Sequence, residues 1–270
     1  MAARPHSVPD AGPLRTGSVI VTVFGDAIVP RGGTVALPGL MRLMRHLGAA
    51  DTAVRTALSR LLADGWLDRT RVGPTSLYSL GARGRTEFAR ATPHIYGPLT
   101  RPWDGSLRLV FADGTTDPAA LEGYAAVTPG VFVSPDGPAV TGLMATGDPD
   151  VVRGLAARAW PLDALAESYT GFTHRFAALP ADANGLEPLP ALAARVTLIH
   201  AWRRIVLRDP RLPAGLLPDD WPGFDARRLC SAAYAAVALA SERHLDTMSD
   251  GPGPLPRGPD PRSRFSGAGS

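Results

Sequence analysis

Lysine is absent from this chain of 270 residues, and cysteine occurs once, at Cys230. A single cysteine excludes an intrachain disulfide framework, which fits a reducing compartment. No apolar run approaches the roughly 18 residues of a membrane-spanning helix. The Pro/Gly-broken first residues also lack the apolar segment of a signal peptide. We therefore expect a cytoplasmic protein with no membrane partner.

The short motifs of common enzyme classes are also missing. The sequence has no Gly-x-Ser-x-Gly elbow, no His-Glu-x-x-His pair, no Walker loop and no paired-cysteine metal site. We therefore expect no enzymatic activity, no metal and no cofactor. One enzyme hypothesis stays open, a hydrolase that would use His200 with an acid near Asp209.

Positive charge comes from arginine alone, with 28 basic residues in the chain. Part of this usage reflects codon bias, since Ala, Gly and Pro are abundant too. The local distribution is more informative. Between Ser18 and Arg90 there are ten arginines and five acidic residues, an excess of five positive charges. A basic segment of this kind points to nucleic acid as a partner.

The segment from Ser18 to about Tyr96 predicts a series of short elements. SVIVTVFGDAIV reads as a core helix, with a strand as the alternative. An extended piece at 34–37 precedes a helix that starts at Pro38 and stops at Gly48. A second helix, capped by Asp51 or Thr52, runs to about Asp64. Two strands, WLDRTR and SLYSL, joined by a turn at Val72-Gly73-Pro74-Thr75, and a helix over 83–91 complete the segment.

The second of these helices has two different faces. At roughly 100° per residue, Val54, Leu58 and Leu61 share one stripe that must pack inward. The opposite face of the helix carries polar side chains, namely Thr52, Arg55, Thr56 and Ser59, with Arg60 at its edge. Arg69 and Arg71 flank the turn of the two-stranded ribbon. Arginine pairs with guanine, and hydroxyl side chains reach phosphates or base edges. The element order is that of a winged helix-turn-helix. The alternative is a solvated surface helix.

The remainder of the chain divides into two blocks. Trp103 to about Pro149 alternates apolar strands with turns and predicts one helix near 119–126. Asp150 to about His244 carries four helical stretches. A Pro-, Gly- and Ser-rich segment follows, which predicts disorder.

Several motifs resemble those of one protein family. FGDAIVPRGG (24–33) and VRTALSRLLADGWLDRTRVGPTSLYSL (54–80) resemble the amino-terminal region of the PaaX family, the repressors of phenylacetate catabolism operons. The likeness recurs at RPWDG (101–105), TPGVFVSP (128–135) and, most specifically, LIHAWRRIVLRDPRLPAGLLPDDWPG (198–223). It covers nearly the whole chain apart from its tails.

The resemblance implies an α+β fold of three domains. A disordered leader (1–17) would precede a winged helix-turn-helix (18–97) and a shortened ferredoxin-like middle domain (98–149), similar to the CRISPR spacer-acquisition nucleases. A helical dimerisation and effector domain (150–247) and a disordered tail (248–270) would follow. Family members are dimeric repressors released by an aryl-acyl-CoA such as phenylacetyl-CoA. We therefore expect a homodimer on palindromic double-stranded DNA, since a repressor of this kind needs two half-sites. By this likeness Arg55, Thr56, Ser59 and Arg60 belong to the recognition helix, and Arg69, Arg71 and Thr75 to the wing.

The middle block departs from the family pattern. Only ADGTTDPAALEGYAAV separates Phe111 from Thr128, where family members carry a longer helix. The phenylacetyl-CoA assignment therefore does not transfer directly, and an activator or a regulator of another pathway stays open. The carboxylates of this block, Asp113, Asp117, Glu122 and Asp136, fall in turns. We expect no nuclease activity, because metal-dependent hydrolysis needs converging carboxylates.

The helix around His200 is the candidate effector site. Thr197, His200, Arg203, Arg204 and Arg208 share one side, and clustered arginines suit the phosphates of a CoA nucleotide. His174 and Arg175 are candidates for the same pocket. The alternative interpretation pairs His200 and Arg204 with Asp209, Asp219 or Asp220 to hold the proline-rich loop in place.

Overall fold

The structure, a computed structural model, describes residues 15–113, 116–117, 121, 123–137 and 142–265. It is an α+β fold with two small antiparallel sheets. The chain forms two compact units: unit 1 comprises 1–97, 172–207 and 226–270, and unit 2 comprises 98–171 and 208–225. These units do not follow the predicted boundary at residue 150. Most of the predicted leader, residues 1–14, lies outside the described residues.

Unit 1 begins with helix α1 (Thr16–Val23), which continues through a π-helical turn (Phe24–Ile28) and a 3₁₀ turn (Val29–Arg31). The predicted core helix is confirmed, and the strand alternative is wrong. Residues 19–24 are all buried, so the β-branched side chains pack inside a helix despite their strand propensity. Gly32 ends the segment at φ 87°, a conformation that other residues disfavour.

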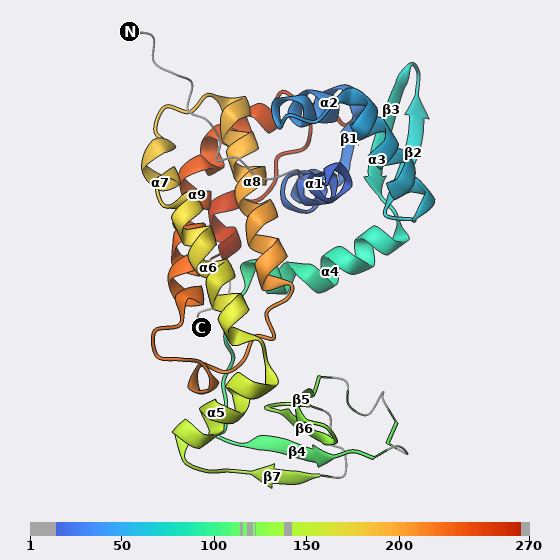
Figure 1. The fold of residues 1–270 in the computed structure, drawn as a ribbon. Helices are drawn as coiled ribbons and strands as arrows, with labels where there is room; N and C mark the ends of the chain where they lie inside the picture. The colour runs from blue at the N-terminus through green and yellow to red at the C-terminus, as the bar shows by residue number, and fades with distance from the viewer. Residues whose placement is uncertain (1–14, 114–115, 118–120, 122, 138–141, 266–270) are drawn as a thin grey trace. The chain divides into compact units, whose positions relative to one another are not determined.

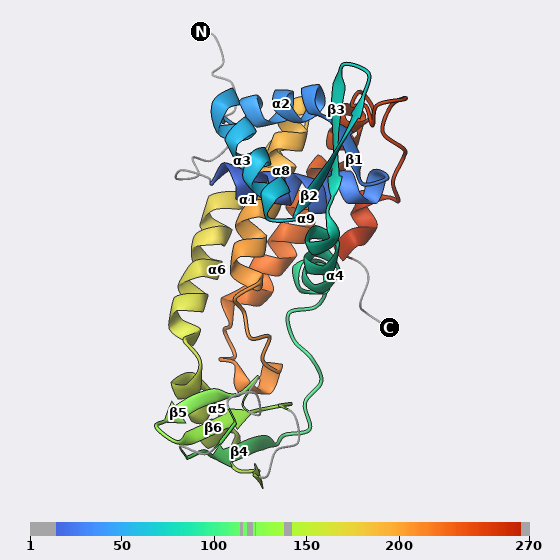
Figure 2. The same cartoon turned by 90° about the vertical axis from the view of Figure 1, so that its right-hand side faces the viewer.

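A three-stranded sheet and two helices follow α1. Their bounds are β1 (Thr34–Ala36), α2 (Leu37–His46), α3 (Asp51–Ala63), β2 (Leu67–Val72) and β3 (Thr75–Leu80). The strand order is β1-β3-β2, all antiparallel. Gly73 takes φ 57° in the two-residue turn, the positive value that a type II′ hairpin requires. Both views show the hairpin tip projecting past the helices of unit 1 (Figures 1 and 2).

Helix α4 (Ala82–Tyr96) is longer than predicted, because the helix continues past Pro93. Tertiary packing overrides the proline here: Ile95 and Tyr96 are buried, and the Trp202 indole donates to the Ile95 carbonyl at 2.7 Å. The predicted caps of α3 are also wrong. Ala50 occupies its N-cap position, and no side chain caps the helix.

The rest of unit 1 is helical. It contains the end of α6 (Leu162–Phe176), the short α7 (Leu179–Asp182), α8 (Pro188–Val206) and most of α9 (Pro222–Leu245). Helix α8 packs against α1 and, through Ala194 and Val237, against α9. Every residue from 191 to 200 is buried, which makes α8 the central helix of the unit (Figure 1). No helix among the described residues has the length and apolar character to cross a membrane.

The predicted disordered tail is largely ordered where the structure describes it. Met248 and Leu255 join the core of unit 1, and a 3₁₀ turn (Pro261–Phe265) closes the described chain. The Phe265 ring lies edge-on to Tyr96 and Tyr234, with centroid distances of 5.2 and 5.4 Å. Tertiary contacts therefore fix a Pro-, Gly- and Ser-rich segment whose sequence shows no helical or strand periodicity.

Unit 2 contains a four-stranded sheet. Its strands are β4 (Leu107–Phe111), β5 (Ala125–Thr128), β6 (Val131–Ser134) and β7 (Leu143–Ala145), in the order β5-β6-β4-β7. Helix α5 (Pro149–Ala159) follows, capped by the Asp148 carboxylate, which accepts from the Asp150 amide at 2.8 Å. The predicted helix near 119–126 is wrong at its end, because Ala125 begins β5. Residues 118–120 and 122 lie outside the described residues.

Candidate nucleic-acid interface

Helix α3 is anchored by its apolar face. Val54, Leu58 and Leu61 are 0, 2 and 9% exposed and belong to the core cluster that α1 and α2 share. The stripe predicted from the helical period is therefore confirmed. Burying three aliphatic side chains stabilises the position of α3 by several kcal/mol, at about 1.5–3 kcal/mol each.

The opposite face of α3 is open to solvent. Every predicted contact on this helix is exposed: Thr52, Arg55, Thr56, Ser59 and Arg60. Neighbouring arginines form surface ion pairs, such as Arg45 with Asp51 at 3.2 Å. Arg55 and Arg60, in contrast, have no ion pair within the described part of the chain. Their guanidinium groups remain available to an external anion.

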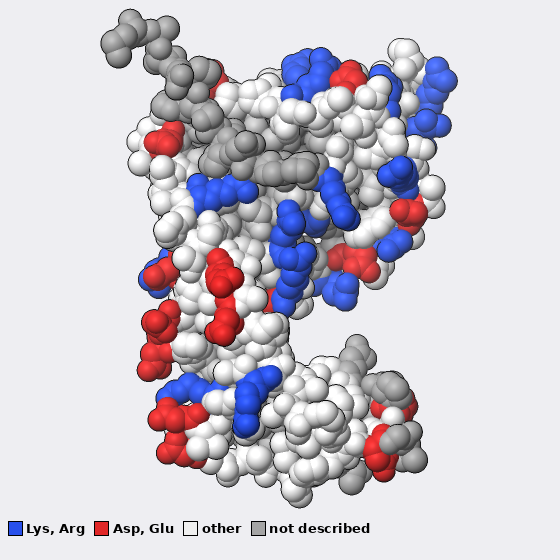
Figure 3. Space-filling model, in the orientation of Figure 1, with Lys and Arg blue, Asp and Glu red and all other residues white. Residues whose placement is uncertain are grey.

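The hairpin extends this surface. Arg69 and Arg71 are exposed on β2, and Thr75 is half-buried at the start of β3. Arg71 Nε donates to the Gly73 carbonyl at 3.3 Å, which leaves the terminal guanidinium nitrogens free of that bond. Arginine side chains gather over α2, α3 and the hairpin (Figure 3). Planar donors in this arrangement match phosphate oxygens and base edges.

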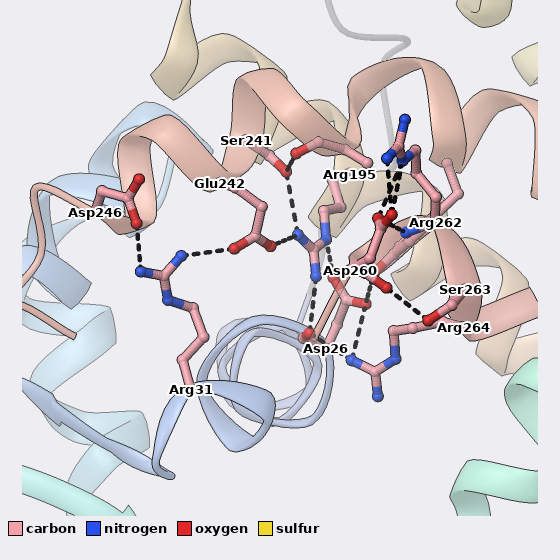
Figure 4. A network of polar contacts seen from close by, with 12 residues as sticks. Asp26, Arg31, Arg195, Ser241, Glu242, Asp246, Asp260, Arg262, Ser263 and Arg264 are labelled. Carbon is pink, nitrogen blue, oxygen red and sulfur yellow. Dashed lines mark hydrogen bonds and ion pairs between the residues drawn. The ribbon is translucent and has the colours of Figure 1, made fainter. Parts of the chain in front are cut away.

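Other arginines of unit 1 are buried in an ion-pair network that sequence analysis missed (Figure 4). Arg195 Nε donates to Asp26 Oδ2 at 2.7 Å, and its Nη1 donates to Glu242 Oε1 at 2.6 Å. Arg31, which is 2% exposed, donates to Glu242 Oε2 at 2.6 Å and to Asp246. Arg31 is one of the ten arginines of the basic segment, yet it serves the interior.

Asp26 is the centre of this network. Its Oδ1 accepts hydrogen bonds from Tyr96 at 2.7 Å and Tyr234 at 3.0 Å, and Arg264 donates to its backbone carbonyl at 2.7 Å. Burial by itself raises the pKa of Asp26. Arg195 and Arg264, with the hydroxyl of Tyr96, outweigh burial, so that the pKa lies below its ordinary value. The carboxylate therefore stays charged, and its contribution to stability is lost only as the pH falls through that lowered pKa.

The sequence carries a signal for this pair. Asp26 lies within the apolar run SVIVTVFGDAIV, and Arg195 lies within LPALAARVTLI. Each charge occurs in a helix that has no polar face at that point. Buried charges are nearly always paired, so two such residues of opposite sign predict each other.

Comparison with known proteins agrees with the geometry. One family model, described as "PaaX-like protein", matches residues 15–84, and a second, "PaaX-like protein C-terminal domain", matches residues 160–247. The transcriptional repressor PaaX of Escherichia coli (strain K12) is 33% identical over 286 aligned residues, which cover 92% of this chain and 90% of that protein. The chain belongs to the PaaX family.

A solved structure is also similar to this PaaX-family chain. The uncharacterized protein Rv0674 from Mycobacterium tuberculosis aligns with a TM-score of 0.55 at 25% identity, covering 86% of this chain and 99% of that one. The family match at 15–84 contains α3 and both strands of the hairpin. The surface described above therefore lies inside the part of the chain that carries the family likeness.

The candidate effector residues of this PaaX-family protein lie in different surroundings. His174 and Arg204 are exposed, and the Arg175 guanidinium lies 5.1 Å from the centre of the Phe176 ring. His200 is buried, with Nδ1 2.9 Å from Thr22 Oγ1, and Arg203 donates to Ser18 Oγ at 2.9 Å. His200 and Arg203 thus face α1.

The predicted pairing of His200 with a loop aspartate is wrong, because its partner is Thr22. Asp209 instead accepts hydrogen bonds from Tyr169 and from the Arg211 amide. Burial, followed by the charges of Arg203, Arg204 and Arg175, lowers the pKa of His200 to about 4. The imidazole is therefore neutral near pH 7.

The middle-block carboxylates show no convergence among the residues that the structure describes. Asp136 pairs with Arg101 at 2.6 Å, and the carboxylate of Asp113 accepts from Thr116. Glu122 lies outside the described residues. The described histidines, cysteine and acids include no group of three that could hold a metal ion.

Proposed function

We propose that this PaaX-family protein is a DNA-binding transcriptional repressor that acts in the cytoplasm. In this proposal α2, α3 and the β2–β3 hairpin form a winged helix-turn-helix, with α3 as the recognition helix. The observation that carries it is the open face of α3, whose arginines have no described acidic partner while the apolar face is anchored. The E. coli relative is a transcriptional repressor by name.

Each candidate contact residue has a role in this proposal. Arg55 reads a guanine in the major groove, and Thr52, Thr56 and Ser59 contact base edges or phosphates. Arg60, at the edge of the face, binds a backbone phosphate. Arg69, Arg71 and Thr75 on the wing contact the neighbouring backbone.

The repressor would act as a homodimer on a palindromic operator, since two copies of α3 would read two half-sites. In unit 2, the strand order β5-β6-β4-β7 supports a ferredoxin-like middle domain, because the second, third, first and fourth strands of that fold lie in this order. An acyl-CoA effector of the phenylacetyl-CoA kind would release the DNA by favouring a conformation that cannot span both half-sites. Two alternatives stay open: an activator, which would differ in where the operator lies relative to the promoter, and a regulator of another pathway, which would bind a different ligand.

The hydrolase alternative has little support. It requires an acid beside His200, but the hydrogen-bond partner of that imidazole is the Thr22 hydroxyl. Turnover of an acyl-CoA thioester that is lost in His200→Ala would restore this alternative.

A mobility-shift titration with operator DNA and scrambled DNA tests the proposal. Arg55→Ala is expected to weaken specific binding by about 1–3 kcal/mol and to relax one base preference. Arg71→Ala should weaken binding to both DNAs alike. Arg158→Ala, which removes an exposed arginine on α5, is the matched control. Equal operator affinity in all four proteins would overturn the recognition-helix assignment.

A further inference from the structure

A groove lies where the start of α1 meets α3 and the end of α8 in unit 1. The described residues leave a hollow of about 410 Å³, lined among others by Arg15, Val21, Arg60, Leu61, Trp66 and Arg203. Small-molecule sites typically enclose roughly 300–1,000 Å³. A second hollow of about 180 Å³ shares Val21, Trp66 and Arg203 with the first, so the two are parts of one groove, here called the α1–α3 groove.

The α1–α3 groove has unbalanced positive charge. Among the described residues, three arginines and no acidic residue line its larger part. Arg203 donates to Ser18 Oγ, but its Nε atom is buried without a hydrogen-bond partner among the described residues. Burial and the charge of Arg204 lower the pKa of Arg203, as expected for a guanidinium without a counter-charge. The one acid in the smaller part, Glu87, pairs with Arg90 at 2.8 Å.

The rest of the groove is apolar and partly aromatic. Trp66 and Phe88 pack edge to face, with ring centres 6.3 Å apart. Val21 and Leu61 are only 8 and 9% exposed and complete an aliphatic wall. A flat apolar group fits such a surface, and an acidic group on the same molecule would reach the arginines.

We propose that the α1–α3 groove binds an amphipathic anion, a flat apolar or aromatic group that carries phosphate or carboxylate, and that this ligand controls DNA binding through Arg60. The regulatory part rests on the proposed role of α3 as the recognition helix. Arg60 lines the groove and also lies at the edge of the DNA-facing surface. A bound anion therefore competes with a DNA phosphate for one guanidinium. This competition acts beside the change of conformation proposed above, and it gives the ligand different affinities for the free and DNA-bound states.

A DNA phosphate by itself explains the groove less well. It would neutralise the arginines but leave the apolar wall beside Trp66 uncovered. Of the effector candidates considered from the sequence, only Arg203 lines the groove.

Calorimetric titration of the full chain with phenylacetyl-CoA, and separately with anilinonaphthalene sulfonate, tests the site. Arg203→Gln is expected to weaken binding about tenfold, the loss of one charge-assisted hydrogen bond. Arg158→Gln is the matched control, since Arg158 is an exposed arginine outside the groove, and the probe affinity of this variant should change less than about twofold. Arg15→Gln, at an exposed position, should weaken binding about threefold and serves if Arg203→Gln fails to fold.

The same proteins are then tested on operator DNA. The proposal is supported if phenylacetyl-CoA releases the wild type from operator DNA but does not release Arg203→Gln. It is overturned if neither probe binds saturably, if Arg203→Gln and Arg158→Gln bind alike, or if Arg203→Gln weakens DNA binding without a probe. A third outcome separates the two proposals: the wild type binds a probe saturably, the binding depends on Arg203, and the wild type does not bind operator DNA. This outcome would support the ligand site and overturn both the proposed function and the coupling.

Discussion

Arg195 on α8 and Arg55 on α3 have the same side chain in opposite surroundings. Arg195 is 1% exposed and is held by Asp26, Glu242 and Ser241, whereas Arg55 lies in solvent with no described acidic partner. A guanidinium can leave water only where carboxylates and hydroxyls replace its hydration. One that stays in water without a partner is free to bind an external anion.

The same distinction divides the ten arginines between Ser18 and Arg90. Arg31 is buried, and Arg45, Arg85 and Arg90 lie within 4 Å of acidic groups at the surface. Six remain without a described acidic partner: Arg42, Arg55, Arg60, Arg69, Arg71 and Arg83. The four arginines of this segment that are proposed to contact DNA or a ligand, Arg55, Arg60, Arg69 and Arg71, all belong to these six.

The largest expected effect comes from removing the charge at the centre of the buried network. Asp26→Asn leaves Arg195 buried with one carboxylate fewer, and we expect the free energy of unfolding to fall by about 3–5 kcal/mol. Urea denaturation at neutral pH measures this loss. A loss below about 1 kcal/mol would show that the network behaves like a surface ion pair, so that buried and exposed arginines would not differ in this respect.

A smaller effect, dependent on pH, is expected at His200. Its pKa in the folded protein is about 4, against an ordinary value of 6.5, so the unfolded chain binds a proton in this window that the folded chain does not. Stability is therefore full above about pH 6.5 and falls as the pH is lowered, by about 2 kcal/mol at pH 5. His200→Asn, which can keep a hydrogen bond to Thr22, should lose about 2 kcal/mol less over this range. Identical pH profiles in urea denaturation would contradict this expectation.

Salt dependence compares exposed with buried arginines. Removing one phosphate contact should reduce the slope of log K against log salt by about 1 for Arg71→Ala. Arg31→Met removes the same charge from the interior and should leave the slope unchanged while lowering stability. Titrations of operator DNA at several salt concentrations measure both slopes. A reduced slope in Arg31→Met would mean that net charge, rather than exposed position, governs binding.

The smallest effect is expected at an exposed ion pair of unit 1. Glu87→Gln removes the partner of Arg90, which is 77% exposed, and should change the free energy of unfolding by less than about 1 kcal/mol. Urea denaturation beside Asp26→Asn makes the comparison direct. A larger loss would indicate that Glu87 also stabilises the α1–α3 groove.

Local patterns predicted much of unit 1. The apolar stripe of α3 and the Gly73 turn follow from helical period and turn chemistry, and both were predicted at the right residues. The proposed contact residues of α3 are exposed for the same reason, since the face opposite a buried stripe must meet solvent. The sequence therefore predicts which side chains are presented, though not what they bind.

Long-range packing accounts for what the sequence did not predict. Asp26 and Arg195 are 169 residues apart, so no local period relates them. Helix α4 passes Pro93 because Ile95 and Tyr96 are buried by distant residues. The proline-rich tail was predicted to be disordered, and Leu255 and Phe265 are ordered by contacts that local composition does not encode.

The link between Asp26 and Arg264 has a consequence during translation. The two residues are 238 positions apart. At about 5–20 residues per second, roughly 10–50 s pass between their synthesis. Arg195, which pairs with the Asp26 carboxylate, is made 169 residues after Asp26, and the network is complete only when Arg264 has followed. Since α3 packs on α1, the support of the proposed DNA-reading surface reaches its final set of contacts only at that late stage of synthesis.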